Sequence, residues 1–106
     1  MDKREVIRTI RNFSKALKRH GICVDRMVLY GSRASGKAKP DSDIDVAVIS
    51  RRFGKDRIEE GKALYRIAGE ISSLLEPVPI SSEAYDKDTW IPLIYEIRKS
   101  GIEVKI

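Results

Sequence analysis

Near the start of the chain, apolar side chains recur every three or four positions, which is the spacing of one buried face of an α-helix. These residues are Val6, Ile10, Phe13 and Leu17. Asp2 and Glu5 precede most of this pattern at the spacing of a capping box, and Gly21 follows its end. The pattern therefore predicts a helix that begins just after Asp2 and ends at about His20.

Two more helices are predicted later in the chain. Asp56 and Glu59 repeat the capping spacing at the start of the second helix, and its inner face is apolar. The inner positions are Leu64, Ile67, Ala68, Ile71 and Leu75. The third helix is expected from about Trp90 to Ser100, with Pro92 in its first turn, where proline is tolerated.

Three short apolar runs have the composition or the alternation of β-strands. They are Met27–Tyr30, Asp43–Ile49 and the alternating residues Ile102, Val104 and Ile106. Helices that alternate with short strands predict an α/β protein built on a sheet. We expect one domain that spans residues 1–106, because this length is enough for one modest core.

The composition limits the location of the protein. Hydrophobic residues make up 42% of the sequence, as in globular proteins, and no apolar segment is long enough for a membrane helix or a signal peptide. The single cysteine, Cys23, excludes an internal disulfide and fits a reducing compartment. We therefore expect a cytoplasmic protein with no membrane partner, in which the Cys23 thiol is buried.

The net charge of the chain is +5 at pH 7. A basic surface suits nucleic acid, but it suits a polyanionic nucleotide equally well. The lysines and arginines are dispersed, and the seven aromatic residues do not alternate with them as a single-strand binder requires. Nucleic acid stays open as a partner, but the sequence does not favour it.

The strand that begins at Asp43 carries the first candidate chemistry. Asp43 and Asp45 are two residues apart, so in a strand they point to one face, roughly 6.6 Å apart along it. Ile44, Val46 and Val48 would point the other way, into a core. Two such carboxylates can bridge one or two Mg²⁺ ions, which prefer oxygen ligands and phosphate partners. The alternative is a strand end with two solvated acids.

A turn suited to phosphate precedes this strand. Gly31 can adopt dihedral angles that other residues avoid and lets the backbone approach a ligand closely, and Ser32 adds a hydroxyl. Arg33 and Lys37 add positive charge for triphosphate oxygens. The alternative is an ordinary turn followed by a solvated basic loop.

Together these features form one longer pattern, G-S-x-A-x-G, then five residues, then S-D-I-D-V. The pattern resembles the signature of the minimal nucleotidyltransferases of the DNA polymerase β superfamily. The matching residues are Gly31, Ser32, Ala34, Gly36, Ser42, Asp43 and Asp45. The chain length and the order of the predicted elements also resemble that family, so the similarity covers essentially all 106 residues.

The resemblance implies a small α/β fold with a mixed central sheet of about four strands flanked by helices. It also implies an enzyme that binds a nucleoside triphosphate, with ATP favoured, and two Mg²⁺ ions, and that transfers a nucleotidyl group to a hydroxyl. Asp43 and Asp45 would then be catalytic residues and metal ligands. The nucleotide-binding residues would be Gly31, Ser32, Arg33 and Lys37.

The family usually places a third carboxylate on a later strand. Leu75–Ile80 resembles that strand and offers Glu76, which would bind a metal ion or take the proton of the acceptor hydroxyl. Pro77 and Pro79 leave the strand geometry open, because proline favours sheet edges and bulges. Glu83 is the alternative third carboxylate, and Glu76 would then be a surface acid at a helix end.

The resemblance also implies a partner. Many similar proteins are antitoxins paired with a helical HEPN-domain protein, so the expected AMP acceptor is a tyrosine of such a partner. Trp90, Ile91, Leu93 and Tyr95 crowd together and would either form a surface for this partner or close a small core. We expect Trp90 to pack rather than to stack on bases. Two other functions stay open, namely an antitoxin that only masks its partner without catalysis, and a basic nucleic-acid-binding module.

Overall fold

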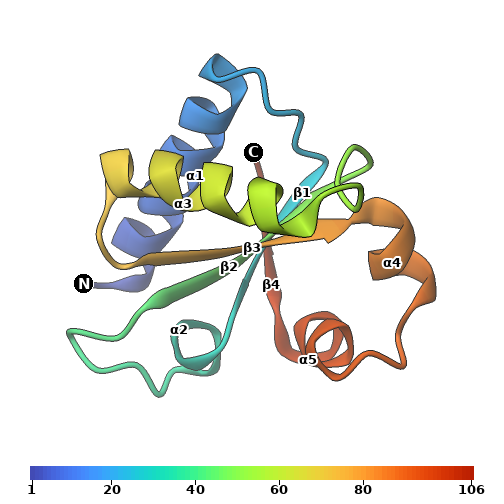
Figure 1. Cartoon of the computed structure of the whole chain (residues 1–106). Helices are drawn as coiled ribbons and strands as arrows, with labels where there is room; N and C mark the ends of the chain where they lie inside the picture. Colours follow the sequence, from blue (N-terminus) through green and yellow to red (C-terminus); the bar gives the residue numbers. More distant parts are fainter.

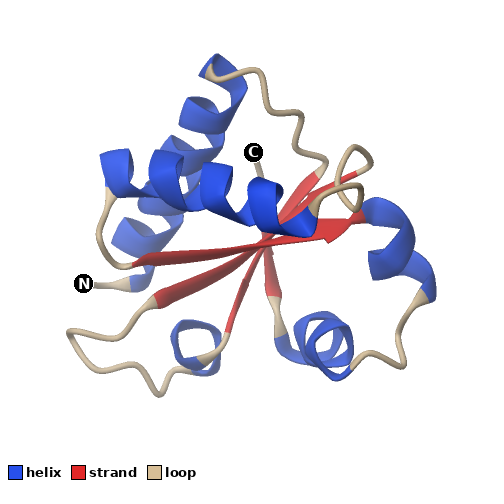
Figure 2. Ribbon diagram, viewed as in Figure 1, coloured by secondary structure: helices blue, strands red, loops and turns tan.

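The computed structural model describes residues 1–106 and is built on a central four-stranded sheet with helices on both faces (Figure 1, Figure 2). In chain order the elements are α1 (Lys3–Arg19), β1 (Arg26–Tyr30), α2 (Ser32–Ser35), β2 (Ile44–Ser50), α3 (Arg57–Ile71), β3 (Leu75–Ser81), α4 (Ser82–Lys87), α5 (Pro92–Ser100) and β4 (Ile102–Val104). This architecture confirms the expected α/β class and the mixed sheet of four strands flanked by helices.

The sheet has the strand order β3-β2-β1-β4. β2 and β3 are parallel, whereas β1 is antiparallel to both of its neighbours. The register pairs Asp45 of β2 with Tyr30 of β1 on one side and with Glu76 of β3 on the other. Residues that pair directly across strands share a face, so these three side chains form one row across the sheet.

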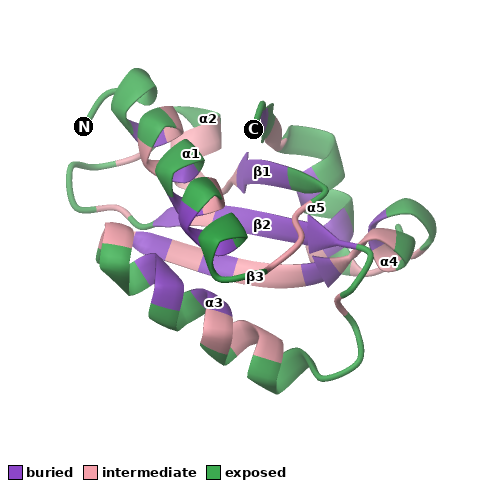
Figure 3. Ribbon diagram, turned by 90° about the horizontal axis from the view of Figure 1, so that it is seen from above, coloured by how far each residue is buried: buried purple, intermediate pink, exposed green.

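The larger core lies between the sheet and helices α1 and α3. It includes Phe13 of α1 and Leu64 of α3, and both are fully buried. Ile44, Val46 and Val48 of β2 face this core, as the alternation along the strand predicted. Figure 3 shows β1 and β2 largely buried, β3 more often intermediate, and the outer sides of α1 and α3 exposed.

The opposite face of the sheet is covered by α4 and α5. Tyr85 of α4 and Ile97 of α5 form a smaller cluster there with residues that include Ala47 of β2. This cluster has 7 buried residues, compared with 15 on the first face. Because Ala47 lies two residues after Asp45, the row that contains Asp45 lies on this less completely covered face.

The predicted starts of the two long helices are confirmed. The Asp2 carboxylate accepts a hydrogen bond from the backbone N–H of Glu5 at 2.9 Å, and Asp56 accepts one from Glu59 at 3.2 Å. Pro92 is the first residue of α5. No helix of the structure combines the length and the apolar character that a membrane-spanning segment requires.

Several predicted boundaries are wrong. Helix α3 ends at Ile71, because Ser72 adopts an extended conformation, and Leu75 begins β3 instead of continuing the helix. Leu75 still packs in the larger core, so the pattern correctly predicted that it is buried but assigned it to a helix instead of a strand. Ile106 lies beyond β4, where it has no strand partner, and it is exposed.

Two predictions about packing are also wrong. Trp90 precedes α5 and its side chain is 77% exposed, so it does not pack in the core. Cys23 lies in the segment between α1 and β1 and is only partly buried. The sequence pattern also missed α4, a helix of six residues whose first turn is capped by the Ser81 hydroxyl.

Strand β3 is an edge strand, which explains its two prolines. The backbone N–H of Ile44 donates to the Leu74 carbonyl at 2.7 Å, and every second residue of β3 then faces β2 in the parallel ladder. Pro77 and Pro79 fall on the positions that face the open edge, where no N–H is needed. The prolines thus leave the pairing of Glu76 with Asp45 intact and protect the edge from pairing with another strand.

Candidate functional site

Carboxylates gather where β2 and β3 begin. Asp45 is half-buried in the row across the sheet, with Glu76 beside it on the next strand. Neighbouring strands lie about 4.8 Å apart, so the two paired residues are adjacent. Asp43 is exposed and lies one residue before β2. The structure therefore brings together the two aspartates of the sequence motif and the glutamate that resemblance suggested.

The electrostatics of these acids follow from their proximity. Burial raises the pKa of Asp45 above its ordinary value, and the nearby Asp43 and Glu96 carboxylates raise it further. Burial likewise raises the pKa of Glu76, with additional repulsion from Asp43 and Asp45. Like charges held together in this way favour a bound proton or a bound cation. The site is therefore electrostatically suited to positive charge.

Gly31 allows Asp45 to take its position. Gly31 has a φ of +72°, a backbone conformation that favours glycine. A Cβ at this position would overlap the Asp45 Oδ2 atom and would lie 3.3 Å from the Asp45 carboxyl carbon. The Asp45 carboxylate therefore lies directly against the turn, and both the backbone angle and the available space require glycine.

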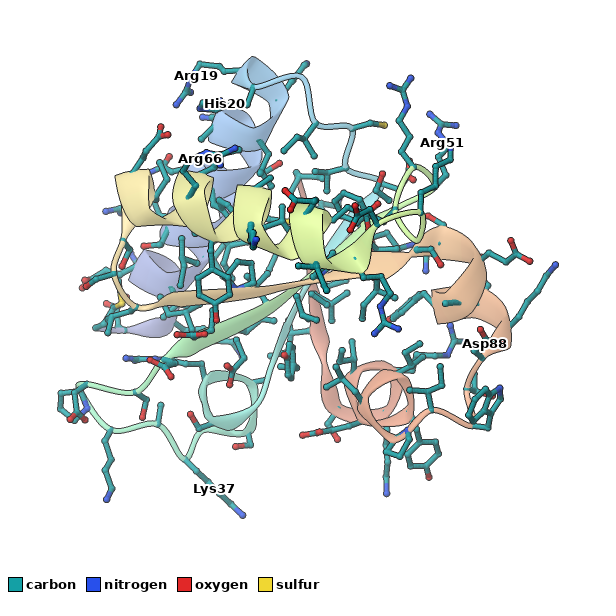
Figure 4. The ribbon with its side chains drawn as sticks, viewed as in Figure 1. Arg19, His20, Lys37, Arg51, Arg66 and Asp88 are labelled. Carbon is teal, nitrogen blue, oxygen red and sulfur yellow. The ribbon has the colours of Figure 1, made fainter.

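The other residues of the turn form the short helix α2. Its backbone N–H groups from Ala34 and Ser35 donate to the Gly31 carbonyl, both at 3.1 Å. Ser32 is half-buried as a residue, and its hydroxyl makes no hydrogen bond within the chain, which leaves it free to bond a ligand. Lys37 lies in the exposed loop after α2, and its side chain points outward into solvent (Figure 4).

Arg33 braces the loop that leads into β2. Its Nη2 atom donates to the carbonyl of Ser42 at 2.9 Å and to that of Pro40 at 3.3 Å. Its Nε atom is buried and has no partner in the chain. Part of the Arg33 guanidinium is thus engaged in holding the loop that carries Asp43.

Three residues join the site that the sequence did not reveal. The Tyr65 hydroxyl of α3 donates a hydrogen bond to Oε2 of Glu76. Tyr30 is half-buried beside Asp45, and burial together with the Asp45, Glu96 and Glu76 carboxylates raises its pKa to about 12. The position of Tyr30 directly before Gly31 was a usable signal. No sequence pattern indicated Tyr65 or Glu96, because their positions depend on how α3 and α5 pack against the sheet.

Glu83 lies away from this cluster. It is exposed in the first turn of α4, which follows the far end of β3, and it is 3.8 Å from Nζ of Lys87. Glu76 is five positions before Ser81, the last residue of β3, which is roughly 17 Å of strand. Between the two candidates for the third carboxylate, Glu76 is the one beside Asp45.

The donors at this site suit magnesium. All three side chains offer carboxylate oxygens, the ligands that Mg²⁺ prefers, and their repulsion creates a need for positive charge. No three acidic, histidine or cysteine side chains are close enough in this conformation to form a complete metal site. Magnesium is commonly bound by one or two carboxylates together with substrate phosphates, so two aspartates fit its ordinary requirements.

Comparisons with known proteins point to the same family that the sequence motif resembles. The family model described as the nucleotidyltransferase domain matches residues 10–102, a range that includes the glycine–serine turn and all three carboxylates. The chain is 31% identical over 104 residues to a protein of Methanocaldococcus jannaschii that is provisionally named a protein adenylyltransferase. That match covers 94% of this chain and 99% of the relative.

A solved structure has the same fold. A crystal structure from Sulfolobus solfataricus, provisionally described as a nucleotidyltransferase, matches with a TM-score of 0.68 and covers 93% of this chain and 78% of the other. The sequence identity is 13%, so this likeness establishes the arrangement of helices and strands only.

Proposed function

The chain belongs to the nucleotidyltransferase domain family, and we propose that this enzyme transfers AMP from ATP to a hydroxyl group of a partner protein. Membership of this family establishes nucleotidyl transfer as the activity. The identities of the nucleotide, the metal and the acceptor are what we propose. The observation that carries it is the position of Asp45 and Glu76 side by side, with Asp45 against Gly31. Such a site can hold both a cation and a phosphate chain.

Asp43 and Asp45 would hold Mg²⁺, with two ions expected, while Glu76 would either bind one of these ions or take the proton of the acceptor hydroxyl. When bound, the metal neutralises phosphate charge and makes the α-phosphorus more open to attack. The remaining chemistry belongs to the residues of the chain. The glycine at position 31 leaves room for phosphate to approach the backbone, and the free Ser32 hydroxyl would donate to a phosphate oxygen.

The two basic residues near the turn would assist the nucleotide in different ways. Lys37 is free in solvent and would approach the triphosphate as a mobile charge. Arg33 already donates to two loop carbonyls and its Nε atom is buried, so its contribution would be to fix the loop that carries Asp43.

Glu76 would accept the proton of the attacking hydroxyl. The Tyr65 hydroxyl already donates a hydrogen bond to Glu76, so this carboxylate is open to a phenolic hydroxyl in the position that a base requires. The acceptor oxygen forms a bond to the α-phosphorus, the bond between the α-phosphorus and the bridging oxygen breaks, and pyrophosphate leaves. Positioning and charge neutralisation would supply most of the acceleration, as in phosphoryl transfer generally.

The proposed acceptor is a tyrosine on a helical HEPN-domain protein, which would make this chain an antitoxin. The name of the M. jannaschii relative supports a protein acceptor. Exposed aromatic surface supports a protein partner, because Trp90 is 77% and Tyr95 is 55% exposed. Next to Trp90, a groove of about 250 Å³ is lined by residues that include Val78, Ile91 and Leu93.

The same surface would also serve an antitoxin that masks its partner without catalysis. The cluster of carboxylates with raised pKa values favours the enzyme over such a silent protein, because repelling acids destabilise a fold that has no use for them. A nucleic-acid-binding module is less well supported. In Figure 4, Arg51 lies well apart from Arg19 and Arg66, and the lysines and arginines are dispersed along the sequence.

The test is transfer of AMP to the partner protein. The purified chain is mixed with ATP, Mg²⁺ and a helical HEPN-domain protein, taken from the adjacent gene where that gene encodes one, and the intact mass of the partner is measured. We expect a gain of one or more AMP groups. Asp45→Asn should abolish the gain, while Asp41→Asn should preserve it, because Asp41 is exposed in the same loop outside the carboxylate row.

Three other outcomes would contradict the proposal. A tight complex in which the partner keeps its mass would support masking alone. Full transfer by the Asp45→Asn variant would remove the carboxylates from the chemistry. Binding to DNA or RNA with a steep salt dependence, without any effect on the protein partner, would favour the nucleic-acid module.

A further inference from the structure

The four tyrosines of the chain differ in their access to the proposed site. Tyr85 is 7% exposed, and the guanidinium groups of Arg26 and Arg98 lie 5.8 Å and 5.1 Å from the centre of its ring. Tyr30 is half-buried in the row across the sheet. Tyr65 and Tyr95 are 50% and 55% exposed. Two tyrosines are therefore open to solvent, and one of them contacts the site.

The contact is made by Tyr65. Its hydroxyl donates a hydrogen bond to Oε2 of Glu76, the carboxylate proposed to take the proton of an acceptor hydroxyl. Glu76 pairs directly with Asp45 in the parallel register. The Tyr65 hydroxyl is therefore linked through a single side chain, Glu76, to Asp45, which would hold the metal. Tyr95 has a similar exposure but no hydrogen bond to an acid.

We propose that Tyr65 is an AMP acceptor within the same chain, so that the enzyme modifies itself when no partner hydroxyl occupies the site. This inference rests on the proposed function, because it uses the same nucleotide and the same base. Tyr65 Oη forms a bond to the α-phosphorus of ATP, and its proton passes to Glu76. The bond to the bridging oxygen breaks, and pyrophosphate leaves with its electron pair.

The modification would also regulate the enzyme. Once Tyr65 carries AMP, its oxygen can no longer donate to Glu76, and a negatively charged phosphodiester lies beside carboxylates that already repel one another. A second triphosphate would therefore bind more weakly. A partner tyrosine that reaches Glu76 first would compete with Tyr65, so the partner would protect the enzyme from inactivating itself.

The experiment uses the full chain alone with ATP and Mg²⁺. We expect intact mass spectrometry to show a gain of one AMP, and peptide mapping to place it on Tyr65. Tyr65→Phe should abolish the gain, while the matched variant Tyr95→Phe should preserve it. Because the hydrogen bond lies within one chain, the rate constant should not change with protein concentration.

A parallel measurement separates the failure of this inference from the failure of the proposed function. Binding of the non-transferable analogue α,β-methylene ATP, with Mg²⁺, is measured by calorimetry on the wild-type chain. Analogue binding with an unmodified Tyr65, or AMP on another residue, would overturn the self-modification and leave the proposed function standing. A chain that neither binds the analogue nor gains AMP would overturn both.

Discussion

The two faces of strand β2 differ in what they contribute. On one face, Ile44, Val46 and Val48 are fully buried beneath α1 and α3. On the other, Asp45 is only half-buried, and burial and repulsion raise its pKa. Both faces gain free energy by removing apolar surface from water, since Ala47 and Ile49 are buried on the second face, but only the second face also retains charges that cost free energy. One strand therefore contributes both to the stability of the fold and to the electrostatic repulsion within the site.

The largest expected effect tests the stabilising face. Phe13 of α1 is fully buried in the larger core. Phe13→Ala should lower the free energy of unfolding by about 3–5 kcal/mol, because it removes apolar contacts and leaves a cavity. Urea denaturation measures this loss. Arg8→Ala, on the exposed side of the same helix, should change it by less than about 0.5 kcal/mol. Similar losses of unfolding free energy in both variants would contradict the assignment of Phe13 to the core and of Arg8 to the surface.

The second prediction concerns the contact between Gly31 of the turn and Asp45 on the charged face of β2. Gly31→Ala should destabilise the fold by about 1–3 kcal/mol, since alanine resists a positive φ. It should also abolish AMP transfer, because the new Cβ displaces the Asp45 carboxylate.

Gly36 provides the matched control for this prediction. Its φ is +81°, but a Cβ there would meet nothing within 4 Å. Gly36→Ala should therefore cost backbone free energy, about 1–2 kcal/mol, while the folded fraction keeps its activity. Equal loss of activity in both variants would mean that backbone strain matters and the contact with Asp45 does not.

The same division between faces explains how much the sequence could predict. The burial of Val46 and Val48 and the spacing of Asp43 and Asp45 follow from the two-residue period of a strand, which is local. These features could be predicted because few residues separate their parts. The motif predicted that the Gly31 turn and the two aspartates serve one site, but it did not predict the contact between Gly31 and the Asp45 carboxylate.

The remaining features depend on packing between distant elements. Tyr65 reaches Glu76 because α3 lies against β3, and Glu96 influences Tyr30 and Asp45 because α5 covers the second face. The prediction that Trp90 packs failed for a related reason, since α5 begins two residues later and leaves that side chain outside. Residue types alone do not determine which side of a helix meets the sheet.

The third prediction measures what the turn contributes to ligand binding. Ser32→Ala should weaken the binding of ATP by about 0.5–1.5 kcal/mol, the net value of one hydrogen bond, while the stability of the fold stays the same. Calorimetry with Mg²⁺ and ATP gives the affinity. In the matched variant Ser35→Ala, the lost hydroxyl donates to the Ser32 carbonyl at 3.2 Å, so affinity should be retained. Equal affinities for Ser32→Ala and the wild type would place the nucleotide away from this hydroxyl.

The smallest expected effect tests whether the charged face costs stability. The pKa of Asp45 in the fold is raised above its ordinary value of 3.8, so the fold favours the protonated acid. Its favourable contribution is therefore complete below about pH 3.8 and is lost as the pH rises through the folded value. At neutral pH without metal, Asp45→Asn should raise the free energy of unfolding by less than about 1 kcal/mol, since it relieves repulsion among partly solvated charges.

Urea denaturation in a chelating buffer measures this gain, with Asp41→Asn as the control variant. The gain should shrink as the pH falls toward the ordinary value, because both side chains are then neutral. A loss of stability at neutral pH would mean that the Asp45 carboxylate supports the fold, and the contrast between the two faces of β2 would not hold.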